Sequence, residues 1–532
     1  MNKKRRSFIV VLVSVTLLLQ ACSAAEVIVT ETNLRVPDQV ALLDAPLEVA
    51  LEAEDVPYQD GGSSYGGQNP VNGEPYRDVF FEDYGVNPFI DTEDDPLSTF
   101  ALDVDTGSYT ITRRYLHDGN LPPDEAIRVE EFVNFFEMGY PLPQQQAFGI
   151  YLEGGPTPFV QNERYRVIRI GIQGYDIPDE ERKDASLTFV IDVSGSMDQE
   201  NRLGAVKEAL TKLVENLRPT DKVGIVVYGS RGEVILEPTP VSEGQTILSA
   251  IRRLSPNGST NAEEGLQLGY RMASEAFLVG GINRVILCSD GVANVGNTGP
   301  DKILESIREH ASQGIQLTTV GFGMGNYNDV LMEQLADDGD GFYAYVDTQE
   351  EAEKLFVNDL TATLQAIAMD AKVQVEFNPE VVTRFRLIGY ENRALDDEDF
   401  RDDTVDAGEI GAGHSVTALY EVKLEENAEG NMATVFLRWQ DPDTHEVTEI
   451  SRSIGSSDLA ASFGETSRTF KLAVLVAEFA EILRESYWAQ EYTLHDLVAE
   501  LNSPDWPLFE RTEVLEFEEL VQRAANLCEQ GN

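Results

Sequence analysis

An apolar strand that ends in three oxygen-bearing side chains constrains this chain most strongly. Residues 187–191 read LTFVI, and Asp192, Ser194 and Ser196 follow at alternate positions. A strand that is buried on both faces has such a near-continuous apolar run. Open α/β sheets bind ligands at the carboxyl ends of their strands, and these side chains are hard oxygen donors of the kind that Mg²⁺ takes. They are too few to satisfy the ion alone, so the sequence predicts a metal with open positions for a partner's acidic group.

Strand-like and helix-like stretches alternate through residues 185–368, with short connections. This order is typical of a Rossmann-like α/β unit, in which helices cover both faces of a mostly parallel sheet. We expect its strands at Leu187–Val193, Val223–Tyr228, Glu233–Pro238, Arg284–Ser289, Gln316–Phe322 and Phe342–Val346. We expect its helices at Leu203–Leu217, Gln245–Leu254, Ala262–Phe277, Lys302–Ser312, Asp329–Leu335 and Glu350–Ala366.

The sequence on either side of this unit has a different pattern. Residues 96–184 predict two short helices, 108–118 and, after Pro122 and Pro123, 124–136, followed by strand-like runs. Residues 369–456 alternate with a period of two, which predicts a β-rich, sandwich-like region, and residues 457–532 predict a helical region. Because strands precede and follow the α/β unit, we expect this unit to be inserted into one β-rich domain.

The first residues are typical of an export signal. Residues 1–21 contain four basic side chains and then an apolar stretch too short to span a bilayer comfortably. The stretch ends in LQAC, which resembles a bacterial lipoprotein box and predicts Cys22 as the lipidated residue. An ordinary signal peptide with an incidental cysteine is the alternative. Residues 22–95 are rich in Gly, Ser, Asn, Pro and acidic residues, which predicts a flexible tether between anchor and folded part.

Composition narrows the classes of partner. The formal net charge is −53, which argues against a nucleic-acid partner because no basic surface is indicated. A solvated acidic surface accounts for most of this charge. Only Cys288 and Cys528 follow Cys22, so no disulfide framework is expected, and Cys288 in an apolar run is predicted to be a small buried hydrophobe.

Two later loops carry side chains of the same chemical kind as the first. Thr260 lies in the turn NGSTN just before an amphipathic helix, and Asp290 lies in CSDG after another apolar strand. Serine or aspartate after a strand also commonly serves as a helix N-cap, which is the alternative for each residue taken alone. The candidate ligands, which three loops present at one edge of one sheet, are Asp192, Ser194, Ser196, Thr260 and Asp290.

The order and spacing of these three motifs resemble the von Willebrand factor type A domain. In that family the five matching positions form the metal-ion-dependent adhesion site. The resemblance implies that Ser194, Ser196 and Thr260 bind Mg²⁺ (or Mn²⁺ or Ca²⁺) directly, and that Asp192 and Asp290 act directly or through water. It also implies that an Asp or Glu carboxylate of a protein partner fills the open position.

The flanking regions extend the resemblance. The motif DVDTGSY at residues 103–109 and the segment 406–421 resemble the bacterial YfbK-type von Willebrand A lipoproteins, over residues 80–530 in all. In relatives of this architecture, ligand binding can couple to movement of the last helix of the domain. That helix corresponds here to residues 350–366.

Two acidic motifs could be mistaken for calcium loops. Asp103, Asp105 and Gly107 lack the further ligands and the bidentate acid of an EF-hand loop, so we expect them to cap a helix. The sequence DDGDG at residues 337–341 is expected to be a helix end that turns into a strand.

These observations favour a non-enzymatic, lipid-anchored recognition protein of the cell envelope, on the periplasmic or the outer face of a membrane. None of the five histidines lies in a hydrolase or zinc-ligand motif, and Ser194 and Ser196 lie in no Gly-x-Ser-x-Gly elbow. One alternative is a structural or envelope-assembly component in which the metal only stabilises the loops. A less favoured alternative is an uncharacterised hydrolase.

Overall fold

The part of the chain that the computed structural model describes begins at residue 80. The predicted signal peptide, Cys22 and the predicted tether up to residue 79 lie outside it. The prediction of a flexible tether is wrong for its last residues, because Ile90 and Asp91 form a strand that pairs with Phe385 and Arg384. Among the described residues, no helix combines the length and the apolarity needed to cross a membrane. The described residues are 80–144, 146–160, 162–291, 300–323 and 327–531.

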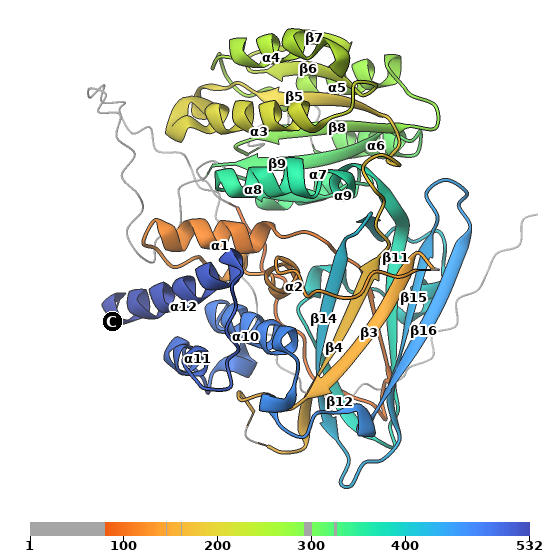
Figure 1. The fold of residues 1–532 in the computed structure, drawn as a ribbon, viewed down its shortest axis with the longest axis vertical. Coiled ribbons are helices and arrows are strands. Elements are labelled where there is room, and N and C mark those ends of the chain that lie inside the picture. Colours follow the sequence, from red (N-terminus) through yellow and green to blue (C-terminus); the bar gives the residue numbers. More distant parts are fainter. Residues whose placement is uncertain (1–79, 145, 161, 292–299, 324–326, 532) are drawn as a thin grey trace, which may run out of the picture. The chain divides into compact units, whose positions relative to one another are not determined.

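Strands from before and after the α/β unit pair within one β-sandwich (Figure 1). Strand β4 (Tyr165–Gly174) pairs antiparallel with β14 (Ser415–Leu424). Likewise, β2 (Leu97–Ala101) pairs antiparallel with β11 (Ala366–Phe377). The expectation that the α/β unit is inserted into a β-rich domain is therefore confirmed.

The sandwich consists of two sheets whose inner faces share one apolar core. Side chains alternate between the faces of a strand, so Ile168 and Ile170 of β4 lie in that core while Val167 faces the other way. The first sheet has the order β1-β12-β14-β4-β3 and includes β1 (Ile90–Asp91), β12 (Val382–Ile388) and β3 (Phe148–Gly155). The second has the order β13-β11-β15-β16, with β2 beside β11, and includes β13 (Gly408–Gly411), β15 (Asn431–Gln440) and β16 (Val447–Gly455).

A layer of helices covers the outer face of the first sheet (Figure 1). Val167 of β4 and Leu419 of β14 pack in the same core as these helices. Tyr140 lies directly on the sheet because Gly171 has no side chain, and a Cβ there would meet the tyrosine ring at 2.1 Å. The helices are α1 (Gly107–His117), α2 (Val129–Asn134), α10 (Arg468–Leu483), α11 (Leu494–Leu501) and α12 (Thr512–Gly531).

The inserted unit is a six-stranded sheet with helices on both faces, as expected. Its order is β10-β9-β8-β5-β6-β7, and all neighbours are parallel except β7, which pairs antiparallel at one edge. The strands are β5 (Ala185–Asp192), β6 (Lys222–Tyr228), β7 (Gly232–Pro240), β8 (Ile282–Ser289), β9 (Gln316–Phe322) and β10 (Tyr343–Val346). The helices are α3 (Arg202–Asn216), α4 (Gly244–Arg253), α5 (Ala262–Glu275), α6 (Pro300–Ala311), α7 (Asp329–Asp337), α8 (Gln349–Glu353) and α9 (Leu360–Leu364).

The central position of β5 in the sheet explains why its sequence is largely apolar. Every residue of β5 is buried. Phe189 and Ile191 pack against the core that includes α3 and α4, while Val190 packs against the core that includes α5 and α7. Cys288, in β8, is fully buried as predicted, and burial raises the pKa of its thiol to about 12.

Two predicted helices are interrupted. The helix expected over 124–136 is a 3₁₀ turn at Asp124–Ala126 followed by α2, because Arg128 between them is extended. The helix expected over 350–366 is α8, a π-helical segment at Lys354–Asn358, and α9. Strand β11 then begins at Ala366, so the last helical segment of the unit leads directly into the sandwich.

Buried ion pairs connect the flanking regions to the inserted unit. Arg113 of α1 donates to Asp347 at 2.8 Å and to Glu351 at 3.0 Å. Arg128 donates to Asp329, at the start of α7, at 2.7 Å, and all these side chains are at least nine-tenths buried. In a low-dielectric interior such pairs hold only if each charge keeps its partner.

The expectation that Asp103 and Asp105 cap a helix is wrong. Thr106 occupies the N-cap position of α1 and makes no side-chain capping bond. The Asp103 carboxylate instead accepts from Arg393 at 3.2 Å, and the Asp105 carboxylate accepts from the amide of Tyr343 at 3.0 Å. The contacts of these two acids are therefore with Arg393 and with the Tyr343 amide of the inserted unit, and not with the amides at the start of α1.

The second acidic motif is placed as expected. Helix α7 ends at Asp337, and Asp340 adopts a left-handed conformation (φ 47°) in the turn before β10.

Replacing Arg113 by methionine should destabilise the protein by about 3–5 kcal/mol, because Asp347 and Glu351 would be left buried without their counter-charge. Chemical denaturation measures this change. The control is Arg401→Met, which removes an exposed pair with Glu449 and should cost less than about 1 kcal/mol. Equal losses in the two variants would contradict the assigned role of Arg113.

Glu130 should make the stability depend on pH. Burial, with a contribution from Glu391, raises the pKa of this carboxyl from 4.5 to about 7, and its Oε2 accepts from the amide of Tyr390. The folded protein thus holds the proton more tightly than the unfolded chain between these values, so stability falls as the pH rises through them. A shift of this size costs up to about 3 kcal/mol at pH 8.

Glu130→Gln retains an acceptor for the Tyr390 amide and cannot ionise, so its stability should fall less between pH 5 and pH 8. Denaturation midpoints measured at a series of pH values test this. Glu376→Gln, at an exposed position, should keep the pH dependence of the parent. A Glu130→Gln profile identical to that of the parent would refute the assignment.

Candidate metal centre

Asp192 lies at the carboxyl end of β5, in the interior of the sheet. It is fully buried, and its two oxygens accept hydrogen bonds from the amide of Ser194 (2.7 Å) and from Ser289 Oγ (3.2 Å). Burial raises the pKa of this carboxyl to about 6, and the nearby Asp290 carboxylate adds to the rise. The carboxylate is therefore held in a fixed orientation, in surroundings that a cation would make more favourable.

Ser194 and Ser196 lie on the turn that follows β5. Their Oγ atoms are 2.9 Å apart, so both hydroxyls face the same point. Ser194 occupies the N-cap position of the 3₁₀ segment Gly195–Asn201, yet its side chain makes no capping bond. The N-cap alternative for Ser194 is therefore wrong, and this hydroxyl remains available to a ligand.

The loop that carries Thr260 is joined to this turn through its backbone. The amide of Asn257 donates to the carbonyl oxygen of Val193 at 2.5 Å, and the amide of Gly195 donates to that of Gly258 at 3.1 Å. The Asn261 side chain caps α5, so Thr260 does not have that role. Within the described part of the chain the Thr260 hydroxyl makes no hydrogen bond, and the residue is half-buried.

Asp290 follows β8 at the same edge of the sheet and is also buried. Arg202, the first residue of α3, donates from Nη1 to Asp290 Oδ2 at 2.7 Å. Burial raises the pKa of the Asp290 carboxyl, while a hydrogen bond from Ser196 and the charge of Arg202 oppose the rise. The structure thus brings the candidate ligands of all three loops to one sheet edge.

Arg202 and Ser289 are two residues of this centre that the sequence analysis missed. Ser289 precedes Asp290 at the end of an apolar strand, so its place at the edge could have been read from the strand pattern. Arg202 reaches back from a helix, and no spacing rule predicts that contact.

The donor set fits a hard divalent cation. Two carboxylates and three hydroxyls are the oxygen donors that Mg²⁺ prefers. Asp192 has hydrogen-bonded oxygens, which suits contact with the ion through water, and Asp290 keeps one oxygen that Arg202 does not occupy in this contact.

Comparison with protein families agrees with this fold. Residues 186–358 match the family model of the von Willebrand factor type A domain, so the inserted unit is a domain of that class. Residues 76–168 match a second model described as von Willebrand factor. Residues 362–431 and 423–527 match the model described as the C-terminal region of the uncharacterized protein YfbK.

The resemblance to YfbK extends through much of the chain. It is 40% identical to the uncharacterized protein YfbK of Escherichia coli K12 over 352 residues, which cover 65% of this chain and 61% of that protein. It is also 26% identical over 265 residues to inter-alpha-trypsin inhibitor heavy chain H3 of Pongo abelii, covering 45% of this chain and 29% of that protein. The chain thus spans less than two thirds of either relative.

Two solved structures match large parts of the chain at low sequence identity. A von Willebrand factor type A protein from Catenulispora acidiphila matches with a TM-score of 0.40 and 15% identity, over 74% of this chain and 89% of that one. The ArnB paralog VWA2 from Sulfolobus acidocaldarius matches with a TM-score of 0.35 and 15% identity, over 72% and 98%.

Gly229→Ala should disturb the candidate centre. A Cβ at Gly229 would come within 2.0 Å of the carbonyl oxygen of Asn257, so the loop that carries Thr260 would have to move. We expect a loss of about 1–3 kcal/mol of stability and weaker binding of Mg²⁺, measured by calorimetric titration. Gly244→Ala is the matched control, because a Cβ there meets no atom within 4 Å. Unchanged Mg²⁺ binding in Gly229→Ala would refute this role of the loop.

Proposed function

We propose that this protein is a membrane-anchored recognition protein of the cell envelope, which binds an acidic side chain of a protein partner through Mg²⁺. Its von Willebrand factor type A domain is of a class that in general mediates protein–protein interactions. In the proposed centre, Ser194, Ser196 and Thr260 would ligate the ion, with Asp192 and Asp290 acting directly or through water. Mn²⁺ or Ca²⁺ would be accepted by the same oxygen donors.

The net charge of the candidate centre is the observation that most strongly supports the proposal. Asp192 and Asp290 supply two negative charges, and Arg202 compensates one of them. A divalent cation would therefore leave the buried site with an excess positive charge, which one further carboxylate would neutralise. A partner's Asp or Glu side chain supplies that charge and an oxygen ligand together.

The chemistry of the centre supports binding rather than catalysis. Its described residues offer carboxylates, hydroxyls and one guanidinium, with no histidine or cysteine among them. A serine nucleophile is commonly activated by a histidine general base, and the described residues of this centre supply none.

Anchoring through Cys22 completes the proposal and rests on the sequence alone. A lipid on Cys22, followed by a tether of the composition found in residues 22–79, would hold the binding edge away from a membrane surface. The partner must lie on the same side of that membrane as the binding edge, in the periplasm or at the cell exterior.

The proposal predicts that Mg²⁺ raises the melting temperature of the purified full chain and that EDTA reverses this. A ligand that binds only the folded state at 100 times its dissociation constant adds about 2.7 kcal/mol. Asp192→Ala should abolish the shift, and Thr260→Ala should reduce it. A Mg²⁺-dependent shift of equal size in the parent and in Asp192→Ala would refute the site.

Pull-downs with and without EDTA separate recognition from stabilisation. Partner capture that disappears in EDTA and in Thr260→Ala supports binding through the ion. Identical capture in both conditions, with the Mg²⁺ shift intact, would instead favour the alternative in which the metal only stabilises the loops.

A further inference from the structure

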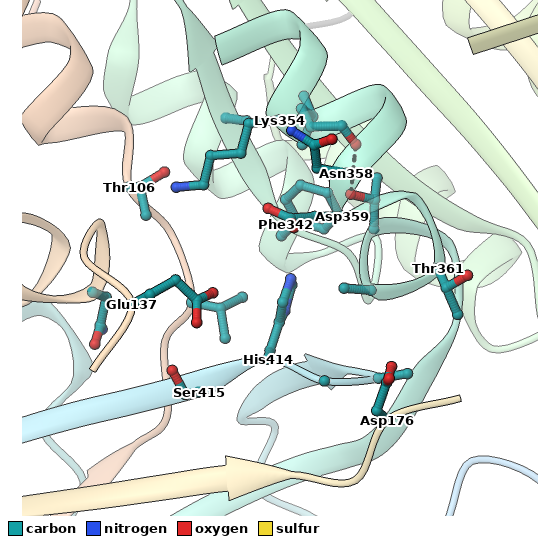
Figure 2. A pocket seen from close by; sticks show the side chains of 18 of the residues that line it. Thr106, Glu137, Asp176, Phe342, Lys354, Asn358, Asp359, Thr361, His414 and Ser415 are labelled. Atoms are coloured by element: carbon teal, nitrogen blue, oxygen red, sulfur yellow. Dashed lines mark hydrogen bonds between the residues drawn. The ribbon is translucent and has the colours of Figure 1, made fainter. Parts of the chain in front are cut away.

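A cavity of about 460 Å³ lies where the inserted unit joins the sandwich (Figure 2). Its walls come from the linker into β5, the last helical segment of the unit, the end of α2 and the turn between β13 and β14. Small-molecule sites commonly enclose about 300–1,000 Å³. None of the five candidate metal ligands lines this space, so it is distinct from the metal centre.

Lys354 supplies the positive charge of this cavity. It is the first residue of the π-helical segment, and such segments are rare and frequently found at functional sites. Its Nζ lies 4.2 Å from the centre of the Phe135 ring and 3.3 Å from the carbonyl oxygen of that residue. Among the described residues it forms no ion pair, although the chain has 93 acidic side chains against 40 lysines and arginines. Its charge is therefore available to an anionic group.

Glu137 and Asp359 supply negative charge to the same space. Glu137 is exposed, just beyond α2, and its carboxylate makes no hydrogen bond or ion pair with any described residue. Burial raises the pKa of the Asp359 carboxyl to about 6, against the effect of the Lys354 charge. Figure 2 shows the Lys354 ammonium and the Glu137 carboxylate directed into the cavity from different elements. The cavity is thus lined by one ammonium group and, at a separate position, by carboxylates.

Neutral polar groups lie between these charges. The His414 ring points into the cavity in Figure 2, and burial lowers its pKa to about 4, so the ring is uncharged near neutral pH. Its Nδ1 is buried and has no hydrogen-bond partner among the described residues. The hydroxyls of Thr106 and Ser415 line the same cavity. The ring is therefore a neutral part of the cavity wall, and the two hydroxyls can hydrogen-bond to a ligand.

We propose that this cavity binds a small zwitterion, either a free amino acid or a short peptide. Its carboxylate would pair with Lys354, and its ammonium with Glu137 and Asp359. A ligand of one charge would pair with only one of these positions, so a molecule that carries both charges fits the cavity best. Thr106, His414 and Ser415 would hydrogen-bond to the polar groups between them.

A ligand here would also connect the two crossings between sandwich and inserted unit. The crossings already contact each other, because Thr361 donates to Asp179 at 2.6 Å and the amide of Lys183 donates to the Gln365 side chain at 2.9 Å. Asp179 and Thr361 both line the cavity. Binding should therefore raise the melting temperature as well as give a calorimetric signal.

Calorimetric titration of the full-length protein with four probes tests the proposal. L-alanine and dialanine carry both charges, whereas N-acetyl-L-alanine carries only the carboxylate and L-alaninamide only the ammonium. We expect one zwitterion to bind about tenfold or more tightly than either singly charged probe. The affinities of L-alanine and dialanine, compared with each other, show whether the cavity prefers a free amino acid or a short peptide. Absence of binding by both zwitterions at millimolar concentration would overturn the proposal.

Matched variants place the binding in this cavity. Lys354→Gln and Glu137→Gln should each weaken binding of the preferred zwitterion about tenfold, and Lys207→Gln, on α3 outside the cavity, should leave it unchanged. Because Glu137 is exposed, Glu137→Gln retains the fold even if Lys354→Gln does not. Affinity equal to that of the parent in Glu137→Gln would refute the assigned ammonium site. EDTA should not change the affinity, so failure here is distinguishable from failure of the metal proposal.

Discussion

Buried arginines of the flanking regions hold the inserted domain through carboxylates that the domain itself supplies. Arg113 pairs with Glu351 of α8, and Arg128 pairs with Asp329 at the start of α7. Ile111 and Tyr115 of α1 pack in one apolar core of the same domain, so packing and charge act together at this contact. The orientation of the domain therefore depends on a few charges that are stable only while paired.

Periodicity in the sequence predicted most of the fold, because each strand and helix buries a regular face. It predicted the apolar β5 and the strands that pair around the insertion. It failed at residues 124–136 and 350–366, where tertiary contacts interrupt a helix-like pattern. Arg128 is extended where its guanidinium reaches a carboxylate 201 residues away, and no local pattern encodes such a contact.

The candidate metal centre was predictable to a similar degree. The five candidate ligands lie in short motifs at strand ends, where topology alone brings loops together. Arg202 was missed because its contact with Asp290 depends on a side chain that reaches back from α3. The cavity at Lys354 was beyond prediction, because its wall residues come from segments as far apart as Thr106 and Ser415.

The insertion has a consequence for how such proteins can diversify. The chain leaves and re-enters the sandwich through crossings that contact each other, at Lys183 and Gln365, so topology alone would accept any guest domain with adjacent ends. The charges add a further condition, since a guest without acids that match Asp329 and Asp347 would leave Arg128 with only Glu131 and Arg113 with only Glu516 of the host. A guest domain that fits the connectivity would therefore still weaken two buried charge clusters unless it supplied acids at the contact.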